Sequence, residues 1–185
     1  MISLFADMAG RFGMNTKEAE RFFKFAVVGA IGFVVDFTIF NLLLRPFNAL
    51  LGMGTPLHDL IAAYGLGDEQ IIALAGTGAG TISFLAAIAS NFIWNRYWTY
   101  PDSRSKSFRR QFAQFVFVNV LGIFIRIPLM ALTTPFFINL VTSFPDLTIY
   151  ATRIGSNLAL MLVVVIVMFW NFFANRYWTY SDVDS

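Results

Sequence analysis

Long apolar runs set the pattern of the chain. A helix that crosses the roughly 30 Å hydrocarbon core of a bilayer needs about 20 mostly apolar residues. Four stretches meet this requirement, at residues 22–44, 71–94, 112–138 and 149–174. The connection at residues 45–70 contains too much proline and glycine for a fifth span, although a short interfacial helix or a re-entrant segment fits it. The pattern therefore predicts an all-α membrane protein with four transmembrane helices.

The composition supports a membrane protein and narrows the chemistry. Hydrophobic residues make up 57% of the 185 residues, and charged residues 13%, about half the usual share of a soluble domain. The sequence has no cysteine, which excludes disulfides, thiolate metal sites and a cysteine nucleophile. It contains no P-loop, zincin motif or nucleophile elbow, and no basic pattern typical of nucleic-acid binding. We therefore expect no catalytic residue, no metal, no cofactor, no enzymatic activity and no nucleic-acid partner. The single histidine, His58, has no partner pattern and is interpreted as a loop residue.

Basic residues are distributed unevenly between the two sides of the predicted spans. Three precede the first span and Lys24 lies in its first turn, five lie between the second and third, and one follows the fourth, whereas only Arg45 and Arg153 lie on the other side. By the positive-inside rule, both termini and the middle connection are cytoplasmic. We therefore expect an integral, multi-pass protein of the inner (cytoplasmic) membrane.

The first 20 residues lack the apolar core and small-residue cleavage site of a signal peptide. They are interpreted as a cytoplasmic or interfacial segment. Either they form a frayed tail, or they form a short helix on the membrane surface whose apolar face consists of Ile2, Leu4, Phe5, Met8 and Phe12.

One ten-residue phrase occurs twice. Residues 91–100 read NFIWNRYWTY and residues 171–180 read NFFANRYWTY, with eight of ten positions identical. At an offset of 90, residues 24–37 align with residues 114–127, which places Asp36 over Arg126. We interpret the chain as one membrane domain, residues 1–185, built from two tandem helical hairpins in the same orientation. Repeat 1 covers about residues 21–100, and repeat 2 about residues 111–180.

The repeated phrase supplies the first candidate site residues. Asn91 and Asn95 share one helical face, as do Asn171 and Asn175. An unpaired amide is costly in lipid, so these asparagines are expected to face inward and to bond either a neighbouring helix or a ligand. The aromatic residues that follow suit the belt at the membrane interface.

Two arginines within the phrase, Arg96 and Arg176, lie at the predicted depth of lipid phosphates. A guanidinium there either grips a phosphate in bidentate fashion or anchors its helix against anionic lipid. Arg153 opens the fourth span on the external side and, together with Asn157, is a candidate lining of an outer vestibule.

Asp36 and Arg126 are the charged residues deep within the spans. Each lies 12 residues beyond the start of its aligned segment, at residue 24 or 114, which is about 18 Å along the helix and just past the middle of the hydrocarbon core. An isolated charge is expensive at that depth, so a direct ion pair between them is predicted. The pair either fixes helix register or forms an anion site in which a phosphate competes with Asp36 for Arg126. Pro128 is positioned to kink the third span beside the charge.

The second span presents a face of small residues, which suits close packing either inside the bundle or between protomers of a homo-oligomer. Its members are Ala75, Gly76, Ala79, Gly80, Ser83 and Ala87.

The chain resembles the GtrA-like family of small four-span membrane proteins. The resemblance rests on the basic-aromatic opening RFFKFAVVGAIGFVVDFTIFNLLL, the aspartate within it, and both NRYWTY phrases. It implies a flippase that moves a polyprenyl-phosphate-linked monosaccharide, of the undecaprenyl-phosphate type, from the cytoplasmic to the outer leaflet for modification of an envelope polysaccharide. The implied partners are this lipid and the bilayer, and a membrane glycosyltransferase is a further candidate partner.

Two other hypotheses remain open at this stage. One is a non-transporting membrane partner that positions a glycosyltransferase. The other is a small proton-coupled exporter in which Asp36 carries the proton.

Overall fold

The structure is a computed structural model that describes residues 15–103 and 105–183. Within these residues the regular elements are all helical, with no strand. Four of the described segments are long and apolar enough to cross a membrane: Thr16–Leu51, Asp68–Thr99, Phe108–Thr142 and Pro145–Thr179. The predicted all-α, four-span class is therefore confirmed. The surface helix suggested for residues 2–12 lies outside the described residues.

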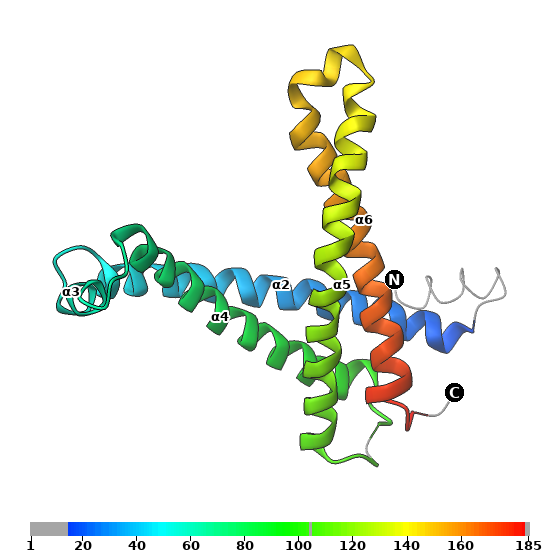
Figure 1. Cartoon of the computed structure of the whole chain (residues 1–185). Helices are drawn as coiled ribbons and strands as arrows, with labels where there is room; N and C mark the ends of the chain where they lie inside the picture. Colours follow the sequence, from blue (N-terminus) through cyan, green and yellow to red (C-terminus); the bar gives the residue numbers. More distant parts are fainter. Residues whose placement is uncertain (1–14, 104, 184–185) are drawn as a thin grey trace. The chain divides into compact units, whose positions relative to one another are not determined.

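Eight helices form these segments and the connections between them in the described residues (Figure 1). In chain order they are α2 (Thr16–Leu51), α3 (Pro56–Ala62), α4 (Asp68–Trp94), the π-helix η1 (Asn95–Thr99), α5 (Phe108–Thr142), the 3-10 helix η2 (Pro145–Tyr150), α6 (Ala151–Ala174) and the π-helix η3 (Asn175–Thr179).

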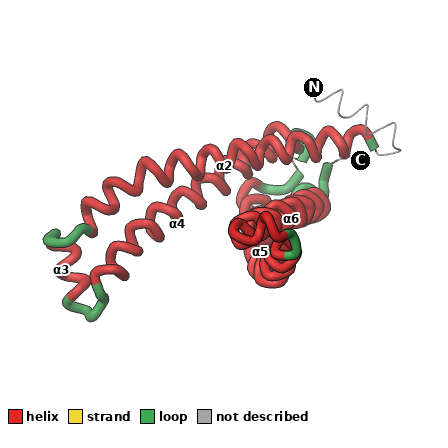
Figure 2. Tube along the Cα trace, turned by 90° about the horizontal axis from the view of Figure 1, so that it is seen from above, coloured by secondary structure: helices red, strands yellow, loops and turns green. Residues whose placement is uncertain are grey.

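The chain divides into two compact units, with the division between Thr99 and Tyr100. In the first unit α2 packs along α4, and α3 joins their ends (Figure 2). In the second unit α5 packs along α6. We call these units the first and second hairpin. The predicted common orientation of the two hairpins in the membrane stays a prediction.

The helices extend beyond the predicted spans. Their ends are polar and are fixed by capping residues, which a search for apolar runs does not detect. The first helix begins at Thr16, where the Asn15 side chain accepts a hydrogen bond from the Lys17 amide at 3.0 Å. It continues through Pro46 to Leu51 rather than ending near residue 44. The short helix considered for residues 45–70 is α3, which Thr55 caps by accepting from the His58 amide at 3.2 Å.

The small-residue face of α4 lies inside the first hairpin. Ala75, Ala79, Ser83 and Ala87, one every four residues, are buried. Toward the loop end, Ala75 joins an apolar cluster with Leu51 and Ile71. This face therefore serves internal packing, and self-association of the protein stays a prediction.

In the second hairpin, α5 and α6 approach each other closely at Gly155. A Cβ atom there would lie 2.6 Å from the backbone nitrogen of Ile138 and 2.7 Å from its Cα. Backbone atoms cannot rotate aside, so only glycine fits this crossing of α5 and α6.

Gly155→Ala is therefore expected to force α5 and α6 apart and to destabilise the protein by about 1–3 kcal/mol, the usual cost of overpacking. The measurement is thermal unfolding of the detergent-solubilised protein. Gly76→Ala is the matched control, because a Cβ at Gly76 meets no heavy atom within 4 Å. Equal melting temperatures for the two variants would contradict the close approach.

Candidate functional site

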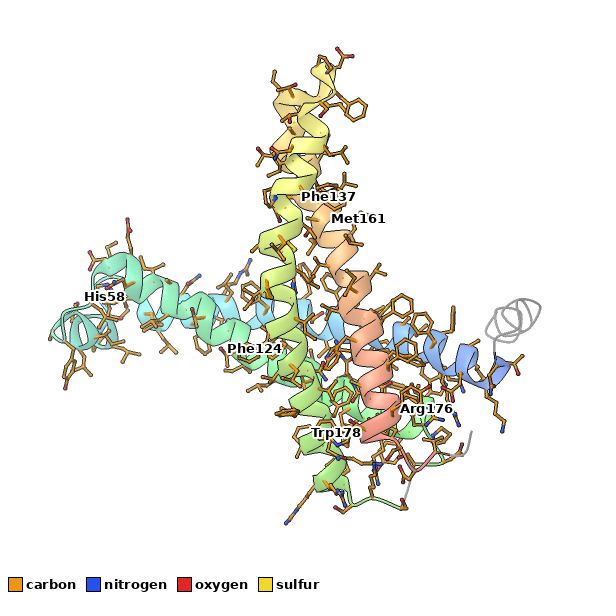
Figure 3. The ribbon with its side chains drawn as sticks, turned by 45° about the vertical axis from the view of Figure 1, so that its right-hand side comes forward. His58, Phe124, Phe137, Met161, Arg176 and Trp178 are labelled. Atoms are coloured by element: carbon orange, nitrogen blue, oxygen red, sulfur yellow. The ribbon has the colours of Figure 1, made fainter. Side chains whose placement is uncertain are left out.

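Both α4 and α6 continue into a π-helical turn of identical sequence, NRYWT. In the second hairpin the Tyr180 amide donates to the Asn175 carbonyl at 2.8 Å, a hydrogen bond that spans five residues. π-Turns are rare and are frequent at functional sites. Figure 3 marks this end of the second hairpin with Arg176 and Trp178. The repeated phrase therefore encodes a specific backbone turn as well as a set of side chains.

Each hairpin places an asparagine against a bare glycine of its partner helix. A Cβ on Gly32 would lie 2.6 Å from Cγ of Asn91, and a Cβ on Gly122 would lie 3.2 Å from Oδ1 of Asn171. Asn91 and Asn171 are half-buried. These two asparagines therefore face the inside of their own hairpins, as the cost of a lipid-exposed amide predicted.

The next asparagines, Asn95 and Asn175, are almost fully buried, at 1% and 0% exposed. In the second hairpin, Asn175 donates to the Asn171 carbonyl at 2.8 Å and accepts from the Thr179 hydroxyl at 2.9 Å. In the first hairpin, the Oδ1 atom of Asn95 and the hydroxyl of Thr99 are buried without hydrogen-bond partners among the described residues. The two turns thus share a fold and differ in how their polar atoms are satisfied.

The arginines of the two turns are buried rather than extended into solvent. Arg96 is 8% exposed and Arg176 is 6% exposed. The Arg176 guanidinium lies 5.6 Å from the ring centroid of Tyr177, within cation–π range.

Only part of the aromatic set suits an interfacial belt. Tyr97 and Tyr177 are exposed, at 53% and 67%. Tyr100 and Tyr180 are instead fully buried and stack on each other in the second unit, with ring centroids 4.4 Å apart. The belt prediction was therefore wrong for this pair, which packs as protein core.

The two charged residues of the spans lie in different hairpins. Asp36 is half-buried on α2 and accepts a hydrogen bond from the Ser83 hydroxyl of α4 at 2.6 Å. Arg126 is exposed on α5 and makes no side-chain hydrogen bond within the described part of its own hairpin. Their ion pair stays a prediction.

Arg153 lies near the start of α6 and is exposed. The Asn157 amide one turn later donates to the Arg153 carbonyl at 2.8 Å. Asn157 therefore satisfies its donor on its own helix.

A polar network in the second unit was not predicted from the sequence. It joins the connection that precedes α5 to the residues at the end of η3 and just after it. Asp182 accepts from the hydroxyls of Ser103 and Ser105. The Lys106 ammonium donates to the carbonyls of Trp178 and Thr179, at 2.7 and 3.3 Å, and so caps the end of η3. These partners lie 72 to 79 residues apart in sequence, so no local motif marks them.

The same network controls the charge of two groups outside the spans. Burial raises the pKa of the Asp182 carboxyl, but the hydrogen bonds from Ser103 and Ser105 outweigh it and bring the pKa to about 2. Burial lowers the pKa of Lys106, the Asp182 carboxylate acts to raise it, and Arg110 lowers it further, so that the net direction is downward.

His58 is also placed differently from the prediction. It lies in α3 rather than in a loop, and it is only 5% exposed (Figure 3). Its Nδ1 atom lies 3.6 Å from the Asp59 carboxylate, and its Nε2 atom 3.5 Å from that of Asp68. The tertiary fold brings the second carboxylate to the ring from ten residues away.

Together these features describe an all-α, multi-pass membrane protein with polar, arginine-bearing helix ends. Residues 24–180 match the family model of the GtrA/DPMS transmembrane domain. The chain therefore belongs to this family, which is associated with polyprenyl-phosphate-linked sugars. No curated protein and no solved structure matches the chain.

Asp182→Asn is expected to lower the melting temperature at neutral pH, because it removes a carboxylate held by hydrogen bonds. The pKa in the folded protein, about 2, lies below the ordinary value of 3.8, so this stabilisation is present above pH 4 and is lost as the pH falls toward 2. The measurement is the gap in melting temperature between wild type and variant across this range. The exposed Asp146, changed to asparagine, is the control. A gap that does not narrow in acid would contradict this role of Asp182.

Proposed function

We propose that the protein is a flippase that moves a polyprenyl-phosphate-linked monosaccharide from the cytoplasmic to the outer leaflet, where the sugar modifies an envelope polysaccharide. The undecaprenyl-phosphate type is the proposed carrier. The observation that carries the proposal is the burial of Arg96 and Arg176 beside buried amides, in a chain of a family associated with lipid-linked sugars.

The proposed substrate has three parts, a phosphodiester, a sugar and a polyprenyl tail, and each requires a different kind of binding surface. Its phosphodiester is anionic, and a guanidinium binds phosphate oxygens in bidentate geometry. Its sugar offers hydroxyls to amide side chains, for which the asparagines at positions 91, 95, 171 and 175 are the candidates. Its polyprenyl tail is apolar and stays in the lipid, against helices whose exposed residues include Phe33, Phe124 and Leu132.

The proposed path of the phosphate follows the arginines. Arg96 and Arg176 receive it at the cytoplasmic side, Arg126 holds it within the membrane, and Arg153 lies at the exit. In this proposal, Asp36 neutralises Arg126 between transport events and releases it when a phosphate binds. The chain has no P-loop motif, so the proposed flux is downhill and is maintained by consumption of the sugar outside.

The proposal includes a setting for this activity. The protein is an inner-membrane protein with both termini cytoplasmic, and its two same-orientation repeats form one domain. The domain is a membrane module to which we assign no catalytic residue. A membrane glycosyltransferase that uses the sugar, and a second copy of the chain, are the proposed protein partners.

Arg126→Ala and Arg96→Ala are expected to slow lipid transfer by about 10- to 100-fold, the usual worth of a hydrogen bond to a charged group. The measurement is the rate at which an undecaprenyl-phosphate sugar becomes accessible on the opposite face of liposomes that contain the purified protein. Arg45→Ala is the control, because Arg45 is exposed and lies outside the proposed path.

Two other outcomes would replace the proposal. Wild-type protein that accelerates no transfer but co-purifies with a glycosyltransferase would instead be a positioning partner. Substrate-dependent proton flux that Asp36→Asn abolishes would indicate a proton-coupled exporter. Asp36 is the residue to test for this second outcome, because it is a half-buried carboxylate on α2 that accepts a hydrogen bond from Ser83 of α4.

A further inference from the structure

The two π-turns have the same sequence but different hydrogen bonding. In the second hairpin, Asn175 and Thr179 bond each other at 2.9 Å, and only the third polar residue, Asn171, keeps a buried Oδ1 without a partner among the described residues. In the first hairpin, all three equivalent residues carry a buried polar atom without a hydrogen-bond partner among the described residues. These atoms are Oδ1 of Asn91, Oδ1 of Asn95 and Oγ1 of Thr99. We call these three residues the polar strip.

The polar strip follows one face of α4 and η1, because its members are four residues apart. Four residues rise about 6 Å along a helix, which is comparable to the width of a pyranose ring. Asn95 and Thr99 are each 1% exposed. Buried polar atoms without partners are uncommon, and their cost is offset when a ligand or an ordered water binds them.

Thr99 departs from the usual behaviour of a helical threonine in this chain. Thr77, Thr81 and Thr133 each donate to the carbonyl four residues earlier, at 2.7 to 3.0 Å. Thr179 donates to the Asn175 side chain instead. Thr99 does neither, so its hydroxyl is available for another partner.

The hydrogen-bonding capacity of the polar strip indicates which kind of ligand can bind it. Two of its open atoms are amide carbonyl oxygens, which only accept hydrogen bonds, and the third is a hydroxyl, which does both. A phosphodiester offers acceptors alone and does not satisfy an amide oxygen. A sugar offers several hydroxyl donors within the span of one ring.

We propose that the polar strip of Asn91, Asn95 and Thr99 is the subsite for the sugar, and that the equivalent turn of the second hairpin is structural. This rests on the proposed function. Thr99 is thereby a specificity-determining residue whose hydroxyl contacts the sugar. The strip is closed to solvent in this structure, so the sugar enters when this helix end opens.

The test compares Thr99→Val with Thr179→Val, two isosteric changes at equivalent positions. Affinity is measured for undecaprenyl phosphate and for undecaprenyl phosphate carrying glucose, galactose or N-acetylglucosamine. Thr99→Val is expected to weaken binding of at least one sugar-bearing lipid by about 2- to 10-fold, the loss of one neutral hydrogen bond, and to leave undecaprenyl phosphate unchanged. Thr99→Ser, which keeps the hydroxyl, should restore binding.

The melting temperatures of the two variants without ligand give an independent measurement. If Thr99 had a purely structural role, Thr99→Val would lower the melting temperature. Thr99→Val removes an unpaired hydroxyl and should leave the melting temperature unchanged or raise it. Thr179→Val breaks a formed hydrogen bond and should lower it. Should Thr99→Val weaken both kinds of lipid equally, or neither, the sugar subsite is wrong and a bound water or the packing alone accounts for the strip. Wild-type protein that binds none of these lipids would overturn the proposed function itself, together with the subsite.

Discussion

Close contact between an asparagine side chain and a glycine backbone is the constraint on which each hairpin depends. Asn91 and Asn171 lie against the bare backbones of Gly32 and Gly122. Any side chain at those glycines would push the amide away from the partner helix. The contact brings the two helices together one turn before the π-turn, and it thereby places the buried arginine that follows.

The two hairpins share this scaffold and differ in the polar groups that it carries. In the first, Asp36 accepts from Ser83, whereas the aligned positions of the second hold Arg126 and Val163. In the second, Lys106 and Asp182 tie the end of η3 to the preceding connection. Within the π-turns, the first hairpin therefore leaves Oδ1 of Asn95 and the Thr99 hydroxyl without partners among the described residues, whereas Asn175 and Thr179 of the second bond each other. In our proposal, the first hairpin binds the sugar. The second contributes Arg126 within the membrane and, at its cytoplasmic end, the π-turn that Lys106 caps.

Much of this fold was readable from the sequence because hydrophobicity and the cost of a buried amide act locally. The four apolar runs predicted the spans, and the i, i+4 asparagines predicted an inward face. The π-turns were missed because a five-residue hydrogen bond leaves no mark in hydropathy. The Asp182 network joins residues more than 70 positions apart, and Tyr100 and Tyr180 cannot be told from belt aromatics until their burial is known. The Asp36–Arg126 pair and the roles of the site residues stay predictions.

The central claim is that arginines of this chain hold the phosphate of a lipid-linked sugar. The most direct measurement is an experimental structure of the protein in lipid with an undecaprenyl-phosphate sugar bound. Our account predicts phosphate density within hydrogen-bonding distance of Arg126 or Arg96, with the polyprenyl tail against the apolar helix surface. Density for the lipid that contacts only apolar side chains, with no arginine at its phosphate, would contradict the account.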